Sequence, residues 1–129
     1  MNEKIAALQF PAANGVVFVE DAERPLSVEL GPSGEPVDPD PTRSVTIGVV
    51  HAMDGLVSIE IQAGEEKPEG LSEFFDGTLT VKHGRLRVRD VSGDNLVTIG
   101  LSPGVSRVRV YSEAAEIPES LVVLVPPIE

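Results

Sequence analysis

Residues 77–112 read GTLTVKHGRLRVRDVSGDNLVTIGLSPGVSRVRVYS, and this stretch decides the fold class. Apolar and polar residues alternate within four runs, as they do in strands that bury one face. Short segments rich in Gly, Pro, Asn and Asp separate the runs, and such residues favour turns. The pattern predicts a four-strand antiparallel meander, with a tight hairpin at His83-Gly84 because Gly accepts the positive φ of a primed turn. The four predicted strands are residues 78–82, 85–91, 96–101 and 106–112.

The same alternation extends outward from this stretch. Residues 45–49 and 57–61 predict two half-buried strands joined through Met53-Asp54-Gly55. Residues 121–125 are apolar at every position, which is typical of a strand covered on both faces. Less regular patterns predict strands at residues 16–20 and 26–30. Residues 31–43 and 64–76 predict surface loops, the first because of its four prolines and the second with at most one helical turn at residues 71–75.

Eight or nine short strands in 129 residues predict a single all-β domain spanning residues 1–129. We expect a two-sheet antiparallel β-sandwich with jelly-roll or Greek-key connections, and a flattened barrel is the alternative. No window sustains the apolar spacing of an amphipathic helix, so helix content is expected to be minimal. The inward phase of the strands predicts these core residues: Phe18, Val28, Ile47, Val49, Val57, Ile59, Leu79, Val81, Leu86, Val88, Ile99, Val108, Val110 and Val123.

Charge and composition exclude several classes of function. The chain has 10 Lys and Arg against 21 Asp and Glu, and its net charge of −11 disfavours nucleic acid and acidic membrane surfaces while favouring basic partners. No apolar run approaches the roughly 18 residues of a membrane span, and the N-terminus does not resemble a signal peptide. The chain has no Cys, which suits a reducing compartment, so we expect a cytoplasmic protein.

No catalytic, metal or nucleotide motif is recognisable in the sequence. His51 is expected at the rim of the fold and His83 at a hairpin tip, and neither lies in a ligand-spaced motif. Asp38-Pro39-Asp40 has the composition of a solvated acidic loop rather than of a calcium site. A Gly-x-Ser-x-Gly elbow and a phosphate-binding loop are both missing. We therefore expect a non-enzymatic protein without cofactor or metal.

The distribution of arginine is the most unusual feature. Residues 77–112 contain six of the ten basic residues and carry a net charge of +4, so the remainder carries −15. Alternation predicts that five arginines share one outer face with Tyr111 beside them, while Thr98 and Gly100 leave room between their strands. Such a face either binds an anionic group or a partner, or simply pairs with Glu and Asp across the sheet. The candidate partner-binding residues are Arg85, Arg87, Arg89, Arg107, Arg109 and Tyr111.

Residues 78–111 also resemble the competence protein J family of small bacterial nuclease inhibitors. The likeness rests on a strand, a Gly-centred turn, a strand ending near Asp90, then Leu101-Ser102-Pro103-Gly104 before an alternating strand, and the late apolar strand at residues 121–125. It implies a β-sandwich that binds a protein partner, and it carries over no catalytic residue. The leading hypothesis is an inhibitor or immunity-type partner of a basic enzyme such as a nuclease, whose cleft must be basic to hold DNA. The alternative is a sandwich that binds a small molecule or carbohydrate, although the chain has no Trp to stack on a sugar.

Overall fold

A computed structural model of the chain describes residues 2–23, 29–30, 36–37, 44–113 and 116–127. Strands dominate it, and the single helical element is the 3-10 turn η1 (Ala13–Gly15) within those residues. Two very short strands, β3 (Glu29–Leu30) and β4 (Pro36–Val37), pair only with each other. The remaining strands are β1 (Glu3–Phe10), β2 (Val16–Asp21), β5 (Ser44–Gly48), β6 (Val57–Ala63), β7 (Ser72–Val81), β8 (Arg85–Asp90), β9 (Leu96–Gly100), β10 (Gly104–Ser112) and β11 (Ser120–Val125).

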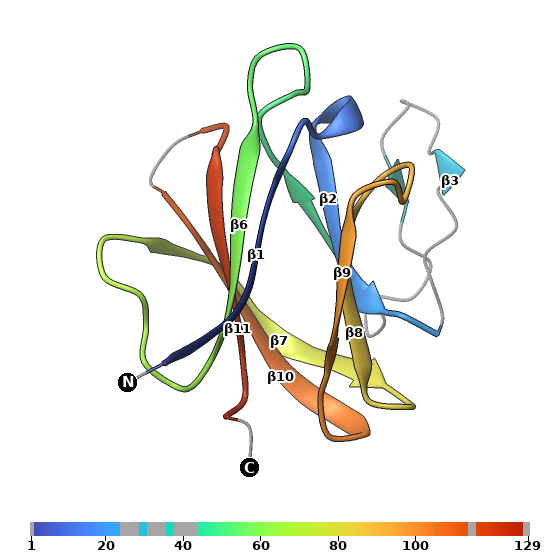
Figure 1. Cartoon of the computed structure of the whole chain (residues 1–129), viewed down its shortest axis with the longest axis vertical. Helices are drawn as coiled ribbons and strands as arrows, with labels where there is room; N and C mark the ends of the chain where they lie inside the picture. Colours follow the sequence, from blue (N-terminus) through green and yellow to red (C-terminus); the bar gives the residue numbers. More distant parts are fainter. Residues whose placement is uncertain (1, 24–28, 31–35, 38–43, 114–115, 128–129) are drawn as a thin grey trace.

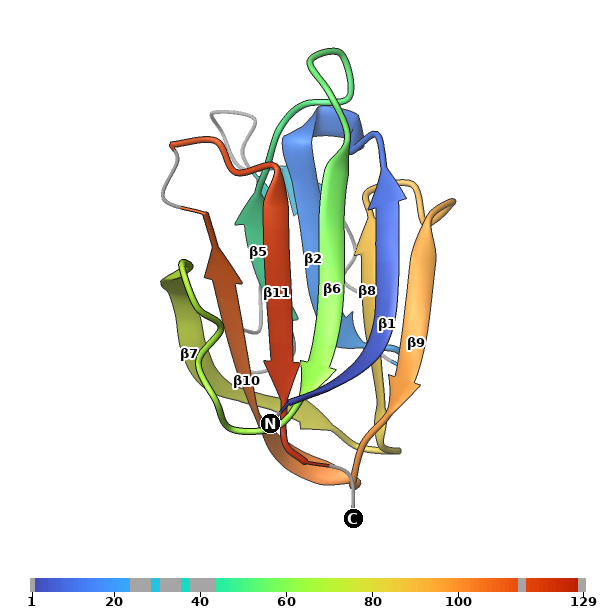
Figure 2. The same cartoon turned by 60° about the vertical axis from the view of Figure 1, so that its left-hand side comes forward.

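The long strands form two sheets that face each other, so the predicted β-sandwich is confirmed (Figures 1 and 2). One sheet has the order β1-β6-β11-β10-β7, here called sheet A, and the other has the order β5-β2-β8-β9, here called sheet B. Neither sheet closes into a barrel, which decides against the alternative. All of their strand pairs are antiparallel except β6 and β11, which run parallel.

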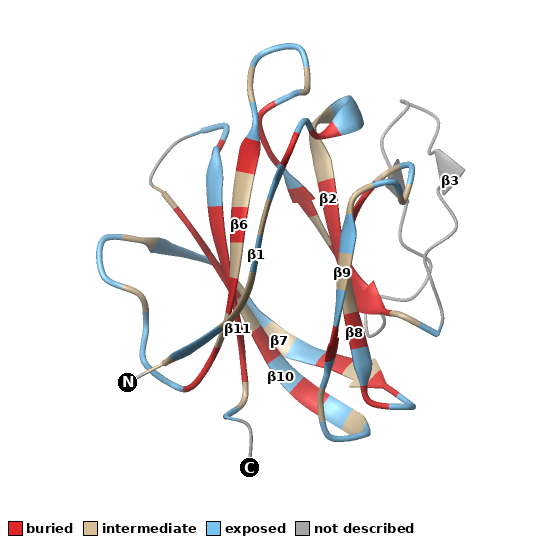
Figure 3. Ribbon diagram, in the orientation of Figure 1, coloured by how far each residue is buried: buried red, intermediate tan, exposed pale blue. Residues whose placement is uncertain are grey.

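Apolar side chains from the inner faces of both sheets make one core (Figure 3). Every predicted core residue that the structure describes is buried, and only Val28 lies outside the described residues. Phe18 is buried on the opposite face of β2 from Val17 and Val19, so it lies outside the main core cluster. On β11, Leu121 and Val123 enter the core. Val122 and Leu124, on the other face of β11, join a second cluster with Tyr111 of β10 and with Leu71. Apolar contacts on both faces confirm that β11 is covered on both sides.

The predicted meander is wrong, because the chain crosses between the sheets at two turns. β7 pairs with β10 in sheet A, while β8 pairs with β9 in sheet B. The turn at residues 82–84 is one residue longer than the expected His83-Gly84 turn, and it joins strands of different sheets, so it is not a hairpin. It packs against the second crossing, where the Leu101 N–H donates to the Gly84 carbonyl at 2.7 Å. Alternation determines which face of a strand is buried but not which strand is its neighbour.

Three further segments differ from expectation. β1 was not predicted, because apolar and polar residues do not alternate cleanly from Ile5 to Leu8. Its pairing with β6 shifts register between Lys4 and Ala6, as at a β-bulge, and such a shift interrupts the alternation of faces. β7 begins at Ser72, inside the loop expected at residues 64–76, so residues 72–76 are strand rather than loop, and the one helical turn allowed at residues 71–75 does not form. The strand expected at residues 26–30 and the loop at residues 31–43 fall mostly outside the described residues, which include only β3 and β4 there.

Candidate functional site

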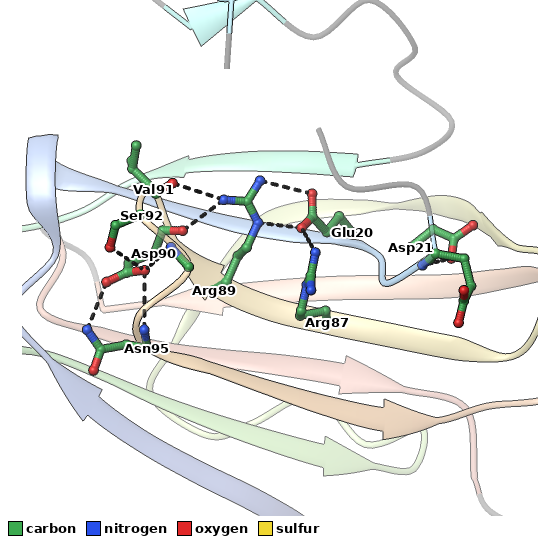
Figure 4. A network of polar contacts seen from close by, with 10 residues as sticks. Glu20, Asp21, Arg87, Arg89, Asp90, Val91, Ser92 and Asn95 are labelled. Atoms are coloured by element: carbon green, nitrogen blue, oxygen red, sulfur yellow. Dashed lines mark hydrogen bonds and ion pairs between the residues drawn. The ribbon is translucent and has the colours of Figure 1, made fainter. Parts of the chain in front are cut away.

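Three of the predicted site residues, Arg85, Arg87 and Arg89, lie on β8, on the outer face of sheet B. Figure 4 shows Arg87 and Arg89 with their contacts. The Arg89 guanidinium donates to both carboxylate oxygens of Glu20 on neighbouring β2, and Arg87 donates to the same carboxylate at 3.2 Å. Arg89 also lies 4.7 Å from the centre of the Phe18 ring, within range of a cation–π contact. Arg85 pairs with Glu23 near the end of the strand.

Burial separates these arginines into different roles. Glu20 is fully buried, and the Arg89 and Arg87 side chains are only 7% and 20% exposed, so they are occupied within the fold. Arg89 further donates to the carbonyls of Asp90 and Val91, which fixes its orientation. Of the three arginines on β8, only Arg85 keeps more than half of its side chain exposed, at 57%.

The other three predicted site residues lie on β10, on the outer face of sheet A. Arg107 forms a bidentate pair with Asp76 on β7, at 2.9 and 2.7 Å, and keeps 55% of its side chain exposed. This pairing lowers the pKa of Asp76 and raises that of Arg107, with the hydrogen bond between them as the main cause. Arg109 donates to the carbonyls of Gly64 and Glu65. Tyr111 is buried in the second apolar cluster.

The expected single arginine face is therefore wrong. β8 and β10 belong to sheets that pack face to face, so their outer faces point away from each other (Figure 2). Thr98 and Gly100 do lie opposite Arg87 and Arg85, as expected, but not beside Arg107 or Arg109. Each of the five arginines contacts an acidic side chain or a backbone carbonyl. Contact of any of them with a partner stays a prediction.

Asp90 organises the turn between β8 and β9. Its Oδ1 accepts the Gly93 N–H at 2.8 Å, and its Oδ2 accepts the Asn95 side-chain amide at 2.8 Å. Burial opposes ionisation of this carboxyl, but the hydrogen bonds from Asn95, Gly93 and Ser92 together outweigh it and hold the pKa of Asp90 below its ordinary value. The carboxylate is therefore part of the folded structure at neutral pH.

Asp90→Asn is expected to lower the free energy of unfolding by about 1–3 kcal/mol at pH 7, because an amide cannot accept at both positions. The folded-state pKa is lower than the unfolded value of 3.8, so the stabilisation is present above pH 3.8 and is lost as the pH falls through the folded-state pKa. Urea unfolding at pH 7 and pH 3 should show the difference from wild type shrinking at the lower pH. The exposed neighbour Asp94→Asn is the control, and equal losses in the two variants would contradict this role.

A different part of the surface lies at one end of the sandwich, where three loops meet. Backbone hydrogen bonds of 2.9–3.0 Å join residues 11–15 to residues 49–52, and residue 50 to residue 118. We call residues 11–15, 49–56 and 116–119 the loop end; its longest loop projects at the top of Figure 1. Three large apolar side chains of these loops are exposed, at 86%, 49% and 62% respectively: Met53, Leu56 and Ile117.

The loop end also has an unusual charge composition. Residues 11–15, 49–56 and 116–119 include three acidic residues, Asp54, Glu116 and Glu119, and no Lys or Arg. All three acidic residues are exposed. The sequence prediction missed this surface because it treated Met53-Asp54-Gly55 only as a turn. Apolar residues placed at turn positions, where no strand could bury them, were the available signal.

Histidine and metal chemistry find little support in the described structure. His51 is exposed at the loop end, where its Nδ1 accepts the Met53 N–H at 3.0 Å, and His83 is exposed in the turn after β7. Within residues 2–23, 44–113 and 116–127, no three His, Asp or Glu side chains come together as a metal site. The described residues also include no helix that could cross a membrane.

One pocket offers a possible small-molecule site. Its volume is about 490 Å³, and it lies between the start of β10 and the residues that follow β11. Leu101, Val105 and Pro126 supply apolar surface, while Ser106 and Arg107 supply polar groups.

Comparison with known proteins identifies structural relatives only. No family model matches the sequence, and no curated protein is similar to it. Among solved structures, the crystal structure of ComJ from Bacillus subtilis, an inhibitor of the DNA-degrading activity of NucA, superposes with a TM-score of 0.70. That match covers 99% of both chains at 8% identity.

The chain folds like ComJ. A second solved structure, crocagin biosynthetic gene J, superposes with a TM-score of 0.62 at 15% identity, over 100% of this chain and 99% of that one. The resemblance to competence protein J inferred from the sequence is thereby confirmed at the level of the fold.

Proposed function

We propose that the chain is a cytoplasmic, non-enzymatic protein that binds and inhibits a basic enzyme such as a nuclease. The observation that carries the proposal is the likeness to ComJ over nearly the whole length of both chains. ComJ inhibits a DNA-degrading enzyme, and the ComJ fold here comes without a recognisable catalytic motif. The sandwich would act by covering the partner rather than by chemistry.

Charge supports the same proposal independently. A nuclease must present a positive cleft to hold the phosphate backbone of DNA. A chain with a net charge of −11 is complementary to such a cleft and would be steered towards it, whereas it would be repelled by DNA itself. Several of its exposed acidic residues have no Lys or Arg nearby in sequence, above all at the loop end.

The test is affinity capture from lysate of the source cells with the immobilised chain at 50 and 500 mM NaCl. We expect capture of a basic enzyme, identified by mass spectrometry, and its release at the higher salt because exposed charge pairs are screened. The captured enzyme is then purified and assayed for DNA degradation. Retention of acidic proteins only, or capture that does not change with salt, would contradict the proposal.

A second candidate function is binding of a small molecule or carbohydrate in the pocket beside Arg107. Its apolar walls fit a small apolar ligand, and Arg107, although paired with Asp76, keeps 55% of its side chain exposed there for an anionic group of that ligand. The Arg85 side chain, on the other sheet and 57% exposed beside Glu23, is a separate candidate for contact with an acidic partner. Thermal shift measurements with a library of anionic metabolites test the pocket. Stabilisation of the wild-type chain, but not of Arg107→Gln, would favour this function.

A further inference from the structure

We infer that the loop end is the surface through which this chain docks a basic protein, with Met53, Leu56 and Ile117 entering an apolar recess of that partner. The inference rests on the proposed function and specifies the surface that carries it. It differs from the sequence prediction, which placed the partner on the arginine strands.

The exposed apolar side chains are the first argument. Six large apolar residues are exposed in the described structure, and three of them lie on these loops. Met53 is the most exposed of the six at 86%, at the tip of the loop between β5 and β6. The other two, Leu56 and Ile117, lie on neighbouring loops, because the Ser58 N–H donates to the Glu119 carbonyl at 2.8 Å. Clustered apolar side chains at loop tips are typical of protein contacts rather than of solvated surface.

The loops that carry these residues are held in place by hydrogen bonds. The His51 carbonyl accepts the N–H groups of Asp54 and Gly55, and the His51 imidazole accepts that of Met53. On the neighbouring loop, the Glu113 carboxylate accepts the N–H groups of Glu119 and Ser120. Since the loops are already ordered, binding would cost little conformational entropy.

Charge determines the kind of partner. The apolar residues are interspersed with the exposed carboxylates of Asp54, Glu116 and Glu119, and the three loops contribute no cation. A second copy of this chain would bring like charges together at such a surface, and nucleic acid would be repelled. A surface with Lys and Arg around an apolar recess satisfies both features.

The other faces are less suited to such a partner. On the outer face of sheet B, Glu20 is already neutralised by Arg87 and Arg89. On the outer face of sheet A, Asp76 is paired with Arg107. These two carboxylates are therefore matched by cations within the fold, whereas the loop end contributes exposed carboxylates and no Lys or Arg.

The experiment measures binding of a ten-residue peptide of alternating Lys and Leu to the ¹⁵N-labelled chain by NMR. A peptide with Ser in place of Leu has the same charge and serves as the probe for electrostatics alone. We expect the Lys-Leu peptide to shift the amide signals of residues 50–56, 116, 117 and 119 and to bind more tightly than the Lys-Ser peptide.

Neutral substitutions separate the apolar contribution from charge. The double variant Met53→Ser, Leu56→Ser is expected to weaken binding of the Lys-Leu peptide about tenfold or more. The control is Val105→Ser, which removes a similarly exposed apolar side chain at the start of β10, the end of that strand away from residues 116–119, and should bind like wild type. Amide shifts centred elsewhere, or equal weakening in Val105→Ser and in the double variant, would overturn the inference.

The same variants distinguish this inference from the proposed function. If a captured nuclease is inhibited equally by wild type and by Met53→Ser, Leu56→Ser, inhibition stands and the surface is wrongly placed. If the peptide binds at the loop end but no enzyme is captured or inhibited, the surface assignment stands and the inhibitor role fails.

Discussion

Glu20→Gln is expected to lower the free energy of unfolding by about 3–5 kcal/mol, because it removes the charge that compensates two guanidinium groups. Glu20 is fully buried, and Arg89, which donates to both of its oxygens, is only 7% exposed. Arg87, 20% exposed, shares the same carboxylate. A buried ion pair need not stabilise a fold relative to apolar residues, but breaking one leaves buried charge without a partner.

Urea unfolding at pH 7 measures this effect, with Glu23→Gln as the matched control. Glu23 pairs with Arg85 at the end of the same strand, where both side chains are partly exposed, so its loss should cost only about 0–1 kcal/mol. A loss below 1 kcal/mol for Glu20→Gln would show that the guanidinium groups are solvated and that the network does not hold β2 to β8.

Gly84→Ala is expected to lower the free energy of unfolding by about 2–5 kcal/mol, from backbone strain and steric overlap together. Gly84 has a φ of +71°, a conformation that favours glycine. A Cβ at this position would lie 2.4 Å from the Leu101 carbonyl oxygen, at the place where the two crossings between the sheets pack together. The backbone of one crossing must move to admit a methyl group.

The control for this prediction is Gly93→Ala, in the turn between β8 and β9. Its φ is +79°, but no atom lies within 4 Å of the added Cβ, so only the backbone cost of about 1–2 kcal/mol applies. Guanidinium unfolding of both variants gives the difference. Equal losses would mean that the close approach of residues 84 and 101 does not contribute to the fold.

The sequence predicted the fold class and the buried faces because both depend on local alternation. Leu86 and Val88 were placed inward, and they are buried in the core. Strand partners could not be predicted in the same way, because a three-residue turn such as residues 82–84 can join strands within one sheet or across two. The strand β1 was missed for a related reason, since its bulge interrupts the alternation.

The arginine prediction failed because it depended on strand partners. Alternation correctly placed Arg87 and Arg107 away from the core, but not on a common surface, since that required β8 and β10 to share a sheet. The burial of Arg89 was also beyond the pattern, because a cation becomes buried only when a carboxylate such as Glu20 is brought beside it. The exposed residue Met53 could have been noticed, since an apolar side chain at a turn position has no strand to bury it.

The rate of DNA degradation by the captured basic enzyme, measured at increasing amounts of the chain, tests the inhibitor role most directly. At low ionic strength the rate is predicted to fall to background at one equivalent of chain, and inhibition should weaken as salt is raised. A rate that stays unchanged with the chain in excess would contradict the inhibitor role.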